Sequence, residues 1–340
     1  MSIHQVGERV RVAVIGIGWW SNVLAAAAGR GLNVEIAGCF TRSKDKRSAF
    51  AAEFGGRAFE RYEAVLADPG IEAIINTTPN HVHRETTEAA AQAGKHVFLD
   101  KPIANTVADG LALTQACADA GVVLALGYQR RREPQFRWIR EEIAQGRFGR
   151  MVQAEGNISR DRVGQFEEGH WRYTAQGMPG GVMLQIGLHY VDVIEMLLGP
   201  VAEVCGMASQ LVLPGENPDV GTLLMRHESG AISSLSTSYA SAAEHYVMNV
   251  YGKEMSAFYD LHAGFRYVRR NEKGAREIGF DAVDTIAGEL DEWAAAVRGH
   301  GEPEVGGLLA TRSLAVVLAG VRSVREKRTV AVAGMMAETG

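Results

Sequence analysis

The sequence predicts an α/β protein with two domains. Residues 1–130 form a parallel sheet covered by helices, and residues 131–340 form an α+β domain with a largely antiparallel, open-faced sheet. Up to about residue 130, apolar runs alternate with alanine-rich helical stretches, which is typical of parallel strands covered on both faces. Beyond about residue 150, strand-like runs follow one another through short turns, which indicates antiparallel strands.

Each half divides into elements, and the boundary between the halves falls within residues 127–136. Strands are predicted in the first half at residues 10–16, 34–40, 71–78, 96–100 and 122–127, separated by helical stretches such as 60–69 and 83–94. Strands are predicted in the second half at residues 151–160, 222–239 (a hairpin turning at 227–230), 245–252, 254–260 and 265–270. Helices are predicted after Gly181, near residues 283–298 and near residues 307–326.

Composition excludes several classes of protein. The net charge is -5, from 35 Lys and Arg against 40 Asp and Glu, so no nucleic-acid or anionic-membrane partner is expected. The first residues lack a long apolar segment behind a basic start, and no uninterrupted apolar run reaches about 18 residues, so we expect neither a signal peptide nor a membrane span. Cys39, Cys117 and Cys205 are scattered, which fits a cytoplasmic protein with reduced thiols and no metal site.

A glycine motif follows the first predicted strand and precedes a helix. Gly16 permits a tight turn, and Gly18 lets the backbone approach a pyrophosphate at the helix N-terminus. This context predicts a Rossmann domain that binds a dinucleotide through Gly16, Ile17 and Gly18, although Ser21 stands at the third glycine position. Trp19 and Trp20 pack under the loop or against the cofactor. The alternative for the whole motif is an ordinary glycine-bearing loop.

The end of the second predicted strand sets the choice of cofactor. An NAD site would place an acid there, but none occurs before Asp45. A hydroxyl and two cations suit a 2′-phosphate, which Arg42 can bind with its planar fork. The sequence therefore favours NADP(H) over NAD, and the alternative is a solvated charge run at a helix start. The predicted contacts are Thr41, Arg42, Ser43 and Lys46.

Residues 180–199 predict a glycine-led turn and a long apolar helix. Gln185, His189 and Asp192 stand at i, i+4 and i+7, so they share one stripe of this helix. Taken alone, a His in such an apolar helix is better explained by a buried polar cluster whose hydrogen bonds are satisfied, and the rest of the chain changes that preference.

With these motifs in order, the chain resembles the glucose–fructose oxidoreductase/inositol dehydrogenase (Gfo/Idh/MocA) family of NAD(P)-dependent oxidoreductases over nearly its whole length. The motifs that carry the resemblance are Gly16–Gly18, residues 77–83, residues 93–102, residues 127–131, Trp171-Arg172, and Gly180-Gly181 leading to His189 and Asp192.

The resemblance implies a role for each matching residue. Lys101 would reach the reacting carbinol and the nicotinamide ribose, and His189 would transfer the proton. The chemistry of alcohol oxidation supports both roles, because the reaction needs a proton acceptor and a cation stabilises the developing alkoxide. The cofactor cleft would be lined by Thr77, Thr78, Pro79, Asn80, His83, Asp100, Lys101 and Gln129, with Trp171 and Arg172 on a loop that closes over the cofactor.

One position departs from the family pattern, which has Asp four residues before the His. Here Gln185 can still accept a hydrogen bond and orient His189, but it carries no charge. A charged hydrogen bond contributes ~1.5–3 kcal/mol and a neutral one ~0.5–1.5, a difference of about one pKa unit. Asp192 could bind His189, pair with a basic group elsewhere, or cap a loop.

The polar segment 157–181 leads into this helix and offers donors and acceptors suited to a polyol, among them Arg160 and Arg162. Arg130, Arg131 and Arg132 follow a strand end, so substrate or cofactor contacts are expected and a carboxylated sugar or ring acid is an option. The predicted substrate residues are Lys101, Arg131, His170, Tyr173, Gln185 and His189.

The leading hypothesis is a dehydrogenase or reductase, preferring NADP, that acts on a secondary alcohol or ketone of a sugar, inositol or related cyclic polyol. Three alternatives stay open. They are a dihydrodiol or cyclic hemiacetal dehydrogenase, a glycosidase that works by oxidation and elimination with bound nicotinamide, and a non-enzymatic dinucleotide sensor. Apolar residues alternate along strands of the second sheet and leave an apolar open face, which further predicts a homodimer or a dimer of dimers.

Overall fold

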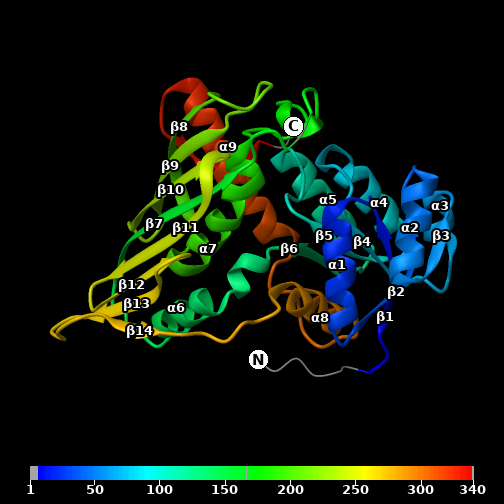
Figure 1. Ribbon diagram of the computed structural model, residues 1–340, viewed down its shortest axis with the longest axis horizontal. Helices are drawn as coiled ribbons and strands as arrows, with labels where there is room; N and C mark the ends of the chain where they lie inside the picture. The colour runs from blue at the N-terminus through cyan, green and yellow to red at the C-terminus, as the bar shows by residue number, and fades with distance from the viewer. Residues whose placement is uncertain (1–6, 166, 339–340) are drawn as a thin grey trace. The chain divides into compact units, whose positions relative to one another are not determined.

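The computed structural model describes residues 7–165 and 167–338. The chain forms two compact units (Figure 1). The first comprises the chain up to Gln129 together with Asp284–Thr311, and the second comprises Arg130–Val283 and the chain from Arg312 onward. Residues 1–6, on which part of the signal-peptide prediction rests, lie outside the described residues.

The assignment of Asp284–Thr311 to the first unit differs from the single cut predicted after residue 130. Helix α8 (Thr285–Val297) causes the difference. It buries Leu290, Trp293 and Ala294 in the same apolar cluster as the first strands. Burying a large apolar side chain such as Leu290 stabilises the fold by about 1.5–3 kcal/mol, and a domain boundary based on sequence order cannot foresee this contact.

The first unit contains a parallel six-stranded sheet in the order β3-β2-β1-β4-β5-β6, which confirms the predicted Rossmann architecture. Helices α1, α2 and α8 share one core cluster with the strands, whereas α4 and α5 pack against each other. The strands are β1 (Val10–Ile15), β2 (Val34–Phe40), β3 (Arg57–Phe59), β4 (Ala73–Asn76), β5 (His96–Asp100) and β6 (Leu124–Gly127). The other helices are α1 (Trp19–Arg30), α2 (Lys44–Phe54), α3 (Tyr62–Ala67), α4 (His83–Gln92) and α5 (Val107–Asp119), with the short turn η1 (Asn80–Val82).

The second unit contains a nine-stranded sheet in the order β14-β13-β12-β11-β7-β10-β9-β8-β15. Only β7 and β10 pair in parallel among these described strands, so the largely antiparallel sheet is confirmed. The strands are β7 (Met151–Asp161), β8 (Val201–Ser209), β9 (Val220–His227), β10 (Ile232–Ser238), β11 (Ala240–Gly252), β12 (Met255–Asp260), β13 (Gly264–Arg269), β14 (Arg276–Ile278) and β15 (Val330–Ala331). Its helical elements are α6 (Pro134–Ala144), η3 (Trp171–Tyr173), η4 (Met183–Gly187), α7 (Leu188–Leu198) and α10 (Val332–Ala337). Two further elements, η2 (Gln129–Arg132) and α9 (Gly307–Glu326), begin in the first unit and end in the second.

Strand β8 was not predicted from the sequence. Its pairing with β9 shifts register between Val201 and Glu203, and this irregularity interrupts the alternation of apolar and polar residues on which strand prediction depends.

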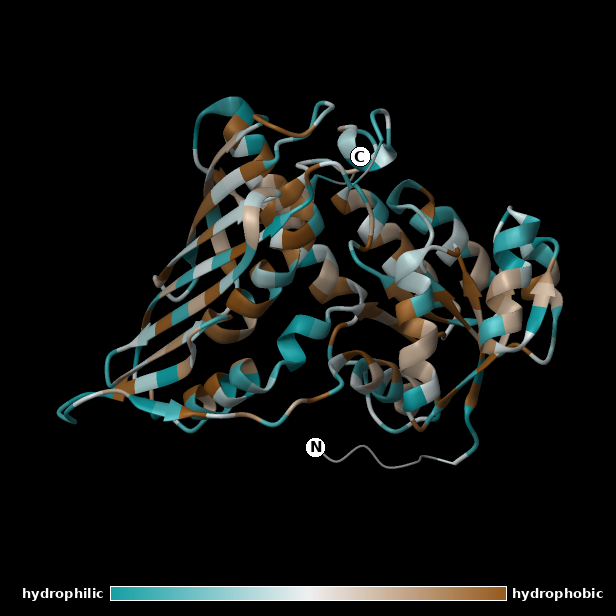
Figure 2. Cartoon of the chain, viewed as in Figure 1, coloured by the Kyte–Doolittle hydropathy of each residue, from teal (hydrophilic) through white to brown (hydrophobic). Residues whose placement is uncertain are grey.

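The two sheets differ in how they are covered. Strands of the first sheet are almost uniformly hydrophobic, whereas those of the second are banded (Figure 2). A Cβ on Gly156 of β7 would lie 3.3 Å from the Tyr190 ring, so α7 covers this face of the second sheet. On the opposite face Met207 is 79% exposed and Leu224 is 52% exposed, as expected for an open face.

Helix α9 is the one helix among the described residues that is long and apolar enough to cross a membrane by length and composition. In its most apolar window 61% of the residues are buried inside the fold, as in the core helix of a globular protein.

An ion pair ties α8 to the strands of the first unit. Arg298 donates to both carboxylate oxygens of Glu72 at 2.6 and 2.9 Å, and also to the carbonyls of Glu8 and Arg9. Glu72 additionally accepts the Arg11 N–H at 2.9 Å. Hydrogen bonding from Arg298 first, and from Arg11 after it, holds the pKa of Glu72 below its usual range against the opposing effect of burial.

We expect Glu72→Gln to lower the free energy of unfolding at pH 7 by about 1–2 kcal/mol, because Arg298 loses its anionic acceptor. The folded pKa of Glu72 is lowered, so the contribution of the pair is complete above the unfolded carboxyl pKa and is lost as the pH falls through the folded one. Urea unfolding between pH 3 and pH 7 should therefore show the wild-type advantage shrinking in acid. Glu228→Gln, which breaks an exposed pair with Arg312, is the matched control. A pH-independent difference would contradict the assignment.

Candidate active site

The predicted cofactor residues follow the carboxyl ends of the parallel strands. Gly16 follows β1, Thr77 follows β4, Lys101 follows β5 and Gln129 lies just beyond β6. The strand order reverses between β1 and β4, and ligands of open parallel sheets bind in the crevice at such a point.

The glycine loop after β1 approaches the β4 loop so closely that no side chain would fit between the two backbones. Gly16 has φ +82°, and a Cβ there would lie 2.5 Å from the Thr78 nitrogen. Gly18 is the N-cap of α1, and a Cβ there would meet nothing within 4 Å, so the space before the helix is open. N–H groups of the first helical turn have no intrahelical partner and bind anions well. The residues present therefore fit a dinucleotide pyrophosphate.

Ser21 takes the position of the third glycine and has its own structural role. Its buried hydroxyl donates to the Gly18 carbonyl at 2.7 Å and accepts the Gly18 N–H at 2.8 Å. The side chain thus holds the turn from inside, a use that the glycine pattern alone does not reveal.

The two tryptophans separate into different environments. Trp20 and Ile17 are half-buried and pack against the core cluster beneath the loop. Trp19 is 72% exposed, with its ring centroid 5.5 Å from that of Trp20. Of Ile17, Trp19 and Trp20, only Trp19 presents a large exposed apolar surface, and it does so at the first residue of α1.

Arg42 and Lys46, the two cations predicted to bind the cofactor, are both exposed at the end of β2 and the start of α2, and Lys44 between them is exposed as well. Ser43 caps α2 by accepting the Lys46 N–H at 3.4 Å, and Thr41 is half-buried. Arg47, which the sequence reading missed, donates to the carbonyls of Thr41 and Arg42 at 3.4 and 3.2 Å. It therefore stabilises the loop that carries the cations.

The β4 loop uses its hydroxyl groups internally. Thr77 Oγ1 donates to the Ile15 and Gly16 carbonyls at 3.0 and 2.8 Å, and Thr78 Oγ1 donates to Asn76 Oδ1 at 2.7 Å. Asn76 is fully buried at the end of β4, and the sequence reading missed it because it completes an apolar run. These contacts hold β4 against the glycine loop.

His83 is placed differently from the prediction that it lines the cleft. The side chain is fully buried, with Nδ1 2.9 Å from the Pro102 carbonyl and Nε2 2.8 Å from the Thr78 carbonyl. Burial lowers its pKa, and the carbonyl groups oppose this effect. The ring joins the β4 loop to the segment after β5, so it supports the site from behind. Asn80 beside it is also buried, and Pro79 is half-buried.

Asp100 and Lys101 are both partly exposed at the end of β5, and a cis peptide bond joins Lys101 to Pro102. Gln129 is half-buried, and its Oε1 is buried with no hydrogen-bond partner among the described residues. Asp100, Lys101 and Gln129 are the last residues at the ends of the first unit's strands that were predicted to belong to the site.

In the second unit the predicted helix begins differently. Met183–Gly187 forms a π-helical turn that contains Gln185, and α7 follows with His189 and Asp192. The predicted stripe assumed one uniform α-helix, and a π turn alters the angle between successive side chains. His189 is 8% exposed and Asp192 is fully buried, whereas Gln185 is half-buried.

The turn before this helix depends on two glycines. Gly180 and Gly181 have φ +84° and +51°. A Cβ on Gly180 would lie 2.4 Å from Val321 Cγ2, and one on Gly181 would lie 2.4 Å from the Pro218 carbonyl oxygen. The predicted glycine-led turn is therefore required both by conformation and by packing.

The structure shows one of the three options for Asp192, a pair with a basic group. Arg131 Nε donates to Asp192 Oδ2 at 2.9 Å, and Nη2 donates to Oδ1 at 2.8 Å. Arg131 is 4% exposed, so its guanidinium is bound to α7 in a buried, two-pronged pair. The prediction that Arg131 contacts the substrate is corrected accordingly, because the pair makes it a support for the helix that carries His189.

The segment before the π turn is held by a loop that the sequence reading missed. Asn217 Nδ2 donates to the carbonyls of Arg172 and Thr174 at 2.8 and 2.9 Å. The Arg172 guanidinium lies 4.3 Å from the Trp171 ring centroid, and the His170 ring stacks on that indole at 5.7 Å. His170, Trp171 and Arg172 are partly exposed, but Tyr173 is only 6% exposed. Burial first and the Arg172 cation second lower the pKa of His170.

The predicted catalytic residues are therefore divided between the two units: Lys101 belongs to the first, and Gln185 and His189 belong to the second. No group of three or more potential metal ligands occurs in residues 7–165 and 167–338.

Comparison with known proteins gives a consistent set of similarities. Residues 10–128 match the model of the GFO/IDH/MocA oxidoreductase family, NAD-binding Rossmann fold, and residues 136–258 match the GFO/IDH/MocA C-terminal domain. The chain is 28% identical over 320 residues to 1,5-anhydro-D-fructose reductase of Ensifer adhaerens, covering 92% of this chain and 96% of that protein. It is 27% identical over 298 residues to scyllo-inositol 2-dehydrogenase (NAD(+)) of Bacillus subtilis, covering 81% and 82%.

Among solved structures, an oxidoreductase of Desulfitobacterium hafniense described as NADPH-dependent superposes with a TM-score of 0.92 at 31% identity. The superposition covers 97% of this chain and 99% of that one.

We expect Asp192→Asn to lower the free energy of unfolding by about 3–5 kcal/mol, because it leaves the buried Arg131 cation without its carboxylate. The double variant Arg131→Met/Asp192→Leu should be less destabilised than Asp192→Asn, because it removes both charges together. Denaturant unfolding of the three proteins measures these differences. A double variant no more stable than Asp192→Asn would show that the stability does not depend on removing both charges together.

Proposed function

Because the chain belongs to the GFO/IDH/MocA oxidoreductase family and is an NAD(P)-dependent enzyme acting on CH–OH groups, we propose that it transfers a hydride between NADP(H) and a polyol. The substrate would be a secondary alcohol or ketone of a sugar, inositol or related cyclic polyol. The observation that carries the proposal is the glycine loop at the β1–β4 reversal, where the Gly16–Thr78 approach excludes any side chain. The named relatives act on an anhydro sugar and on an inositol.

The preference for NADP(H) rests on the end of β2. Arg42 and Lys46 are exposed there, and the first acid after the end of β2 is Asp45, inside α2. A guanidinium fork and an ammonium can bind a 2′-phosphate, whereas a ribose hydroxyl would call for a carboxylate. The D. hafniense relative, described as NADPH-dependent, supports the same choice.

Chemical roles follow from the residue types. A bound nicotinamide supplies the hydride acceptor or donor. The Lys101 ammonium stabilises negative charge on the reacting oxygen, and a ring nitrogen of His189 accepts the alcohol proton. Gln185 orients the His189 ring through its amide without placing a negative charge beside the base.

A turnover screen tests the proposal. Sugars, inositols and related polyols are supplied with NADP+ and with NAD+, and nicotinamide absorbance is followed over many turnovers. We expect continuous net reduction of NADP+ with at least one polyol. Cofactor binding without turnover of any member would instead favour a dinucleotide sensor.

We expect Lys101→Met to lower turnover at least about a hundredfold, because the reacting oxygen loses its cationic partner. Cofactor affinity should change much less. Steady-state kinetics with saturating cofactor measure the first effect, and fluorescence titration of NADPH measures the second. Lys253→Met, which removes an exposed lysine of the second unit, is the matched control. Near-normal turnover in Lys101→Met would remove this residue from the catalytic set.

We expect Arg42→Ala to weaken NADP+ binding by ~1.5–3 kcal/mol while NAD+ affinity barely changes, because only NADP+ carries the phosphate that the guanidinium binds. Titration of the variant and the wild type with both cofactors measures the difference. A wild-type protein that already prefers NAD+ would overturn the cofactor assignment.

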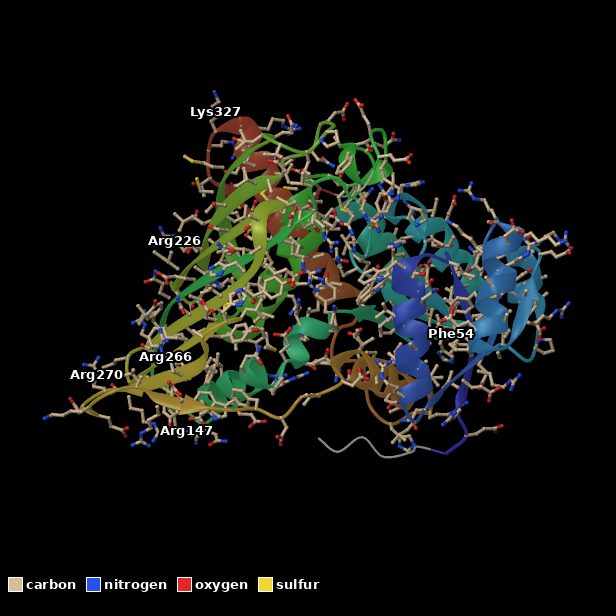
Figure 3. All side chains as sticks on the ribbon, viewed as in Figure 1. Phe54, Arg147, Arg226, Arg266, Arg270 and Lys327 are labelled. Atoms are coloured by element: carbon tan, nitrogen blue, oxygen red, sulfur yellow. The ribbon has the colours of Figure 1, made fainter. Side chains whose placement is uncertain are left out.

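The proposal extends to a cytoplasmic homodimer or dimer of dimers formed through the open face of the second sheet. Cys39 and Cys117 are buried as free thiols, which fits this location. Met207, Leu224 and Ile232 are exposed on strands of that face, while Arg226 extends outward from β9 (Figure 3). Exposed apolar residues of this kind favour self-association. Light scattering at micromolar concentration should give a multiple of 36.7 kDa, and a monomer would contradict the proposal.

A further inference from the structure

Arginine side chains gather at one end of the helix-covered face of the second sheet. Along β7, residues 156, 158 and 160 share a face, because side chains alternate along a strand. A Cβ on Gly156 would touch the Tyr190 ring, so this is the face covered by α7. Arg160 therefore continues the covered face toward the end of β7. Asp161 falls on the opposite face and accepts the Val163 N–H.

The arginines begin where the π turn stops covering the sheet. Ile158 pairs with Thr237 of β10 and Tyr246 of β11, and these three residues form one row across the sheet. A Cβ on Gly187 would lie 3.0 Å from Thr237 Cγ2, so the π turn packs on this row. Arg160 stands two residues farther along β7, about 7 Å beyond the row.

Two tyrosines organise the cluster. The guanidinium carbons of Arg130 and Arg160 lie 4.7 and 5.3 Å from the Tyr246 ring centroid, and Arg160 Nε donates to the Tyr246 hydroxyl. The guanidinium carbon of Arg162 lies 6.0 Å from the Tyr239 ring centroid. The backbone N–H of Arg162 donates to the Tyr239 carbonyl at 2.9 Å. Rings that pack against guanidinium groups fix their positions without neutralising their charge.

The positive charges of Arg130, Arg160 and Arg162 are not all paired with carboxylates of the second unit. Arg130 pairs with Glu133, and Arg160 lies 3.3 Å from Glu244, whose side chain is 55% exposed. Among the described residues, Arg162 has no carboxylate within 4.0 Å, and its Nε is buried without a hydrogen-bond partner. Its Nη1 donates to Gln165 at 2.5 Å. Burial raises the pKa of Tyr239, so this hydroxyl stays neutral and cannot act as the missing anion.

A buried guanidinium donor without an acceptor is costly, and a carboxylate or phosphate oxygen supplies both the missing hydrogen bond and the missing charge. Arginine is well suited to such groups because its donors match their geometry. The position supports a substrate contact, since the cluster begins one row beyond the turn that carries Gln185.

We propose that Arg160 and Arg162 form a subsite for an anionic group of the substrate, a carboxylate or a phosphate monoester attached to the polyol. This inference rests on the proposed function and narrows its substrate class to acidic or phosphorylated polyols.

The test uses three probes that differ at one carbon: D-glucose, D-glucuronate and D-glucose 6-phosphate. Each is titrated calorimetrically into the full-length protein loaded with NADPH, which cannot accept a hydride from an alcohol, and inorganic phosphate and acetate are titrated as the bare groups. At least one of the four anions should bind tenfold or more tightly than D-glucose, with an affinity that falls as salt rises. Comparison of the carboxylates with the phosphates distinguishes the two sources of charge.

Two variants locate the binding. Arg162→Gln should weaken the preferred anion at least tenfold and leave the weak binding of D-glucose unchanged, and Arg162→Lys should restore part of the loss. Arg270→Gln, at the exposed end of β13 and labelled in Figure 3, is the matched control and should bind as the wild type does. Thermal unfolding of each variant verifies that it is folded.

Anions that bind no more tightly than D-glucose, or bind equally to wild type and Arg162→Gln, overturn the subsite. The titration does not depend on turnover, so its result is separate from the proposed function. Oxidation of neutral polyols with no preference for anions would keep the proposed function and remove the subsite. Anion binding without turnover of any polyol would do the reverse.

Discussion

The close approach of the β1 loop to the end of β4 is the constraint on which the candidate site depends. A Cβ at Gly16 would lie 2.5 Å from the Thr78 nitrogen, and φ there is +82°. Both facts require glycine, and together they bring two backbones into contact at the point where strand order reverses. The second unit repeats the principle at Gly180 and Gly181, where Val321 and the Pro218 carbonyl leave no room for a side chain. In each unit the functional segment is positioned by a turn that only glycine can form.

Polar side chains around these turns act mainly on the protein itself. Ser21 closes the glycine loop, Thr77 binds two carbonyls of the β1 end, and His83 joins the β4 loop to the segment after β5. Buried hydrogen bonds of this kind contribute about 0.5–1.5 kcal/mol each, and leaving one partner unsatisfied costs more. A residue that lies in a cofactor motif can therefore serve the site by fixing the loop. The side chains that remain partly or fully exposed at this edge include Trp19, Arg42, Lys46, Asp100 and Lys101.

Arginine side chains of the second unit also differ in whether the protein itself supplies their partner. Asp192 neutralises Arg131 through two hydrogen bonds, which binds α7 to the segment after β6. Arg160 and Arg162 lie against aromatic rings, and the carboxylate that pairs with Arg160, Glu244, is 55% exposed. A complete internal pair suits a structural support, whereas an excess of cationic donors suits recognition of an anion. Arg131 and Arg162 are both arginines near the candidate site, and their partners give them different roles.

The sequence by itself determined the periodic features and the positions of the glycine turns. Alternating strands and helices predicted the parallel sheet, and Gly16, Gly180 and Gly181 marked turns that local conformation demands. Tertiary structure alone placed α8 in the first unit, paired Asp192 with Arg131, buried His83 and revealed Asn76 and Asn217 as supports. The physical reason is the range of the interactions. Periodicity and turn conformation depend on neighbours within a few residues, whereas burial and ion pairing join residues such as Arg131 and Asp192, 61 positions apart.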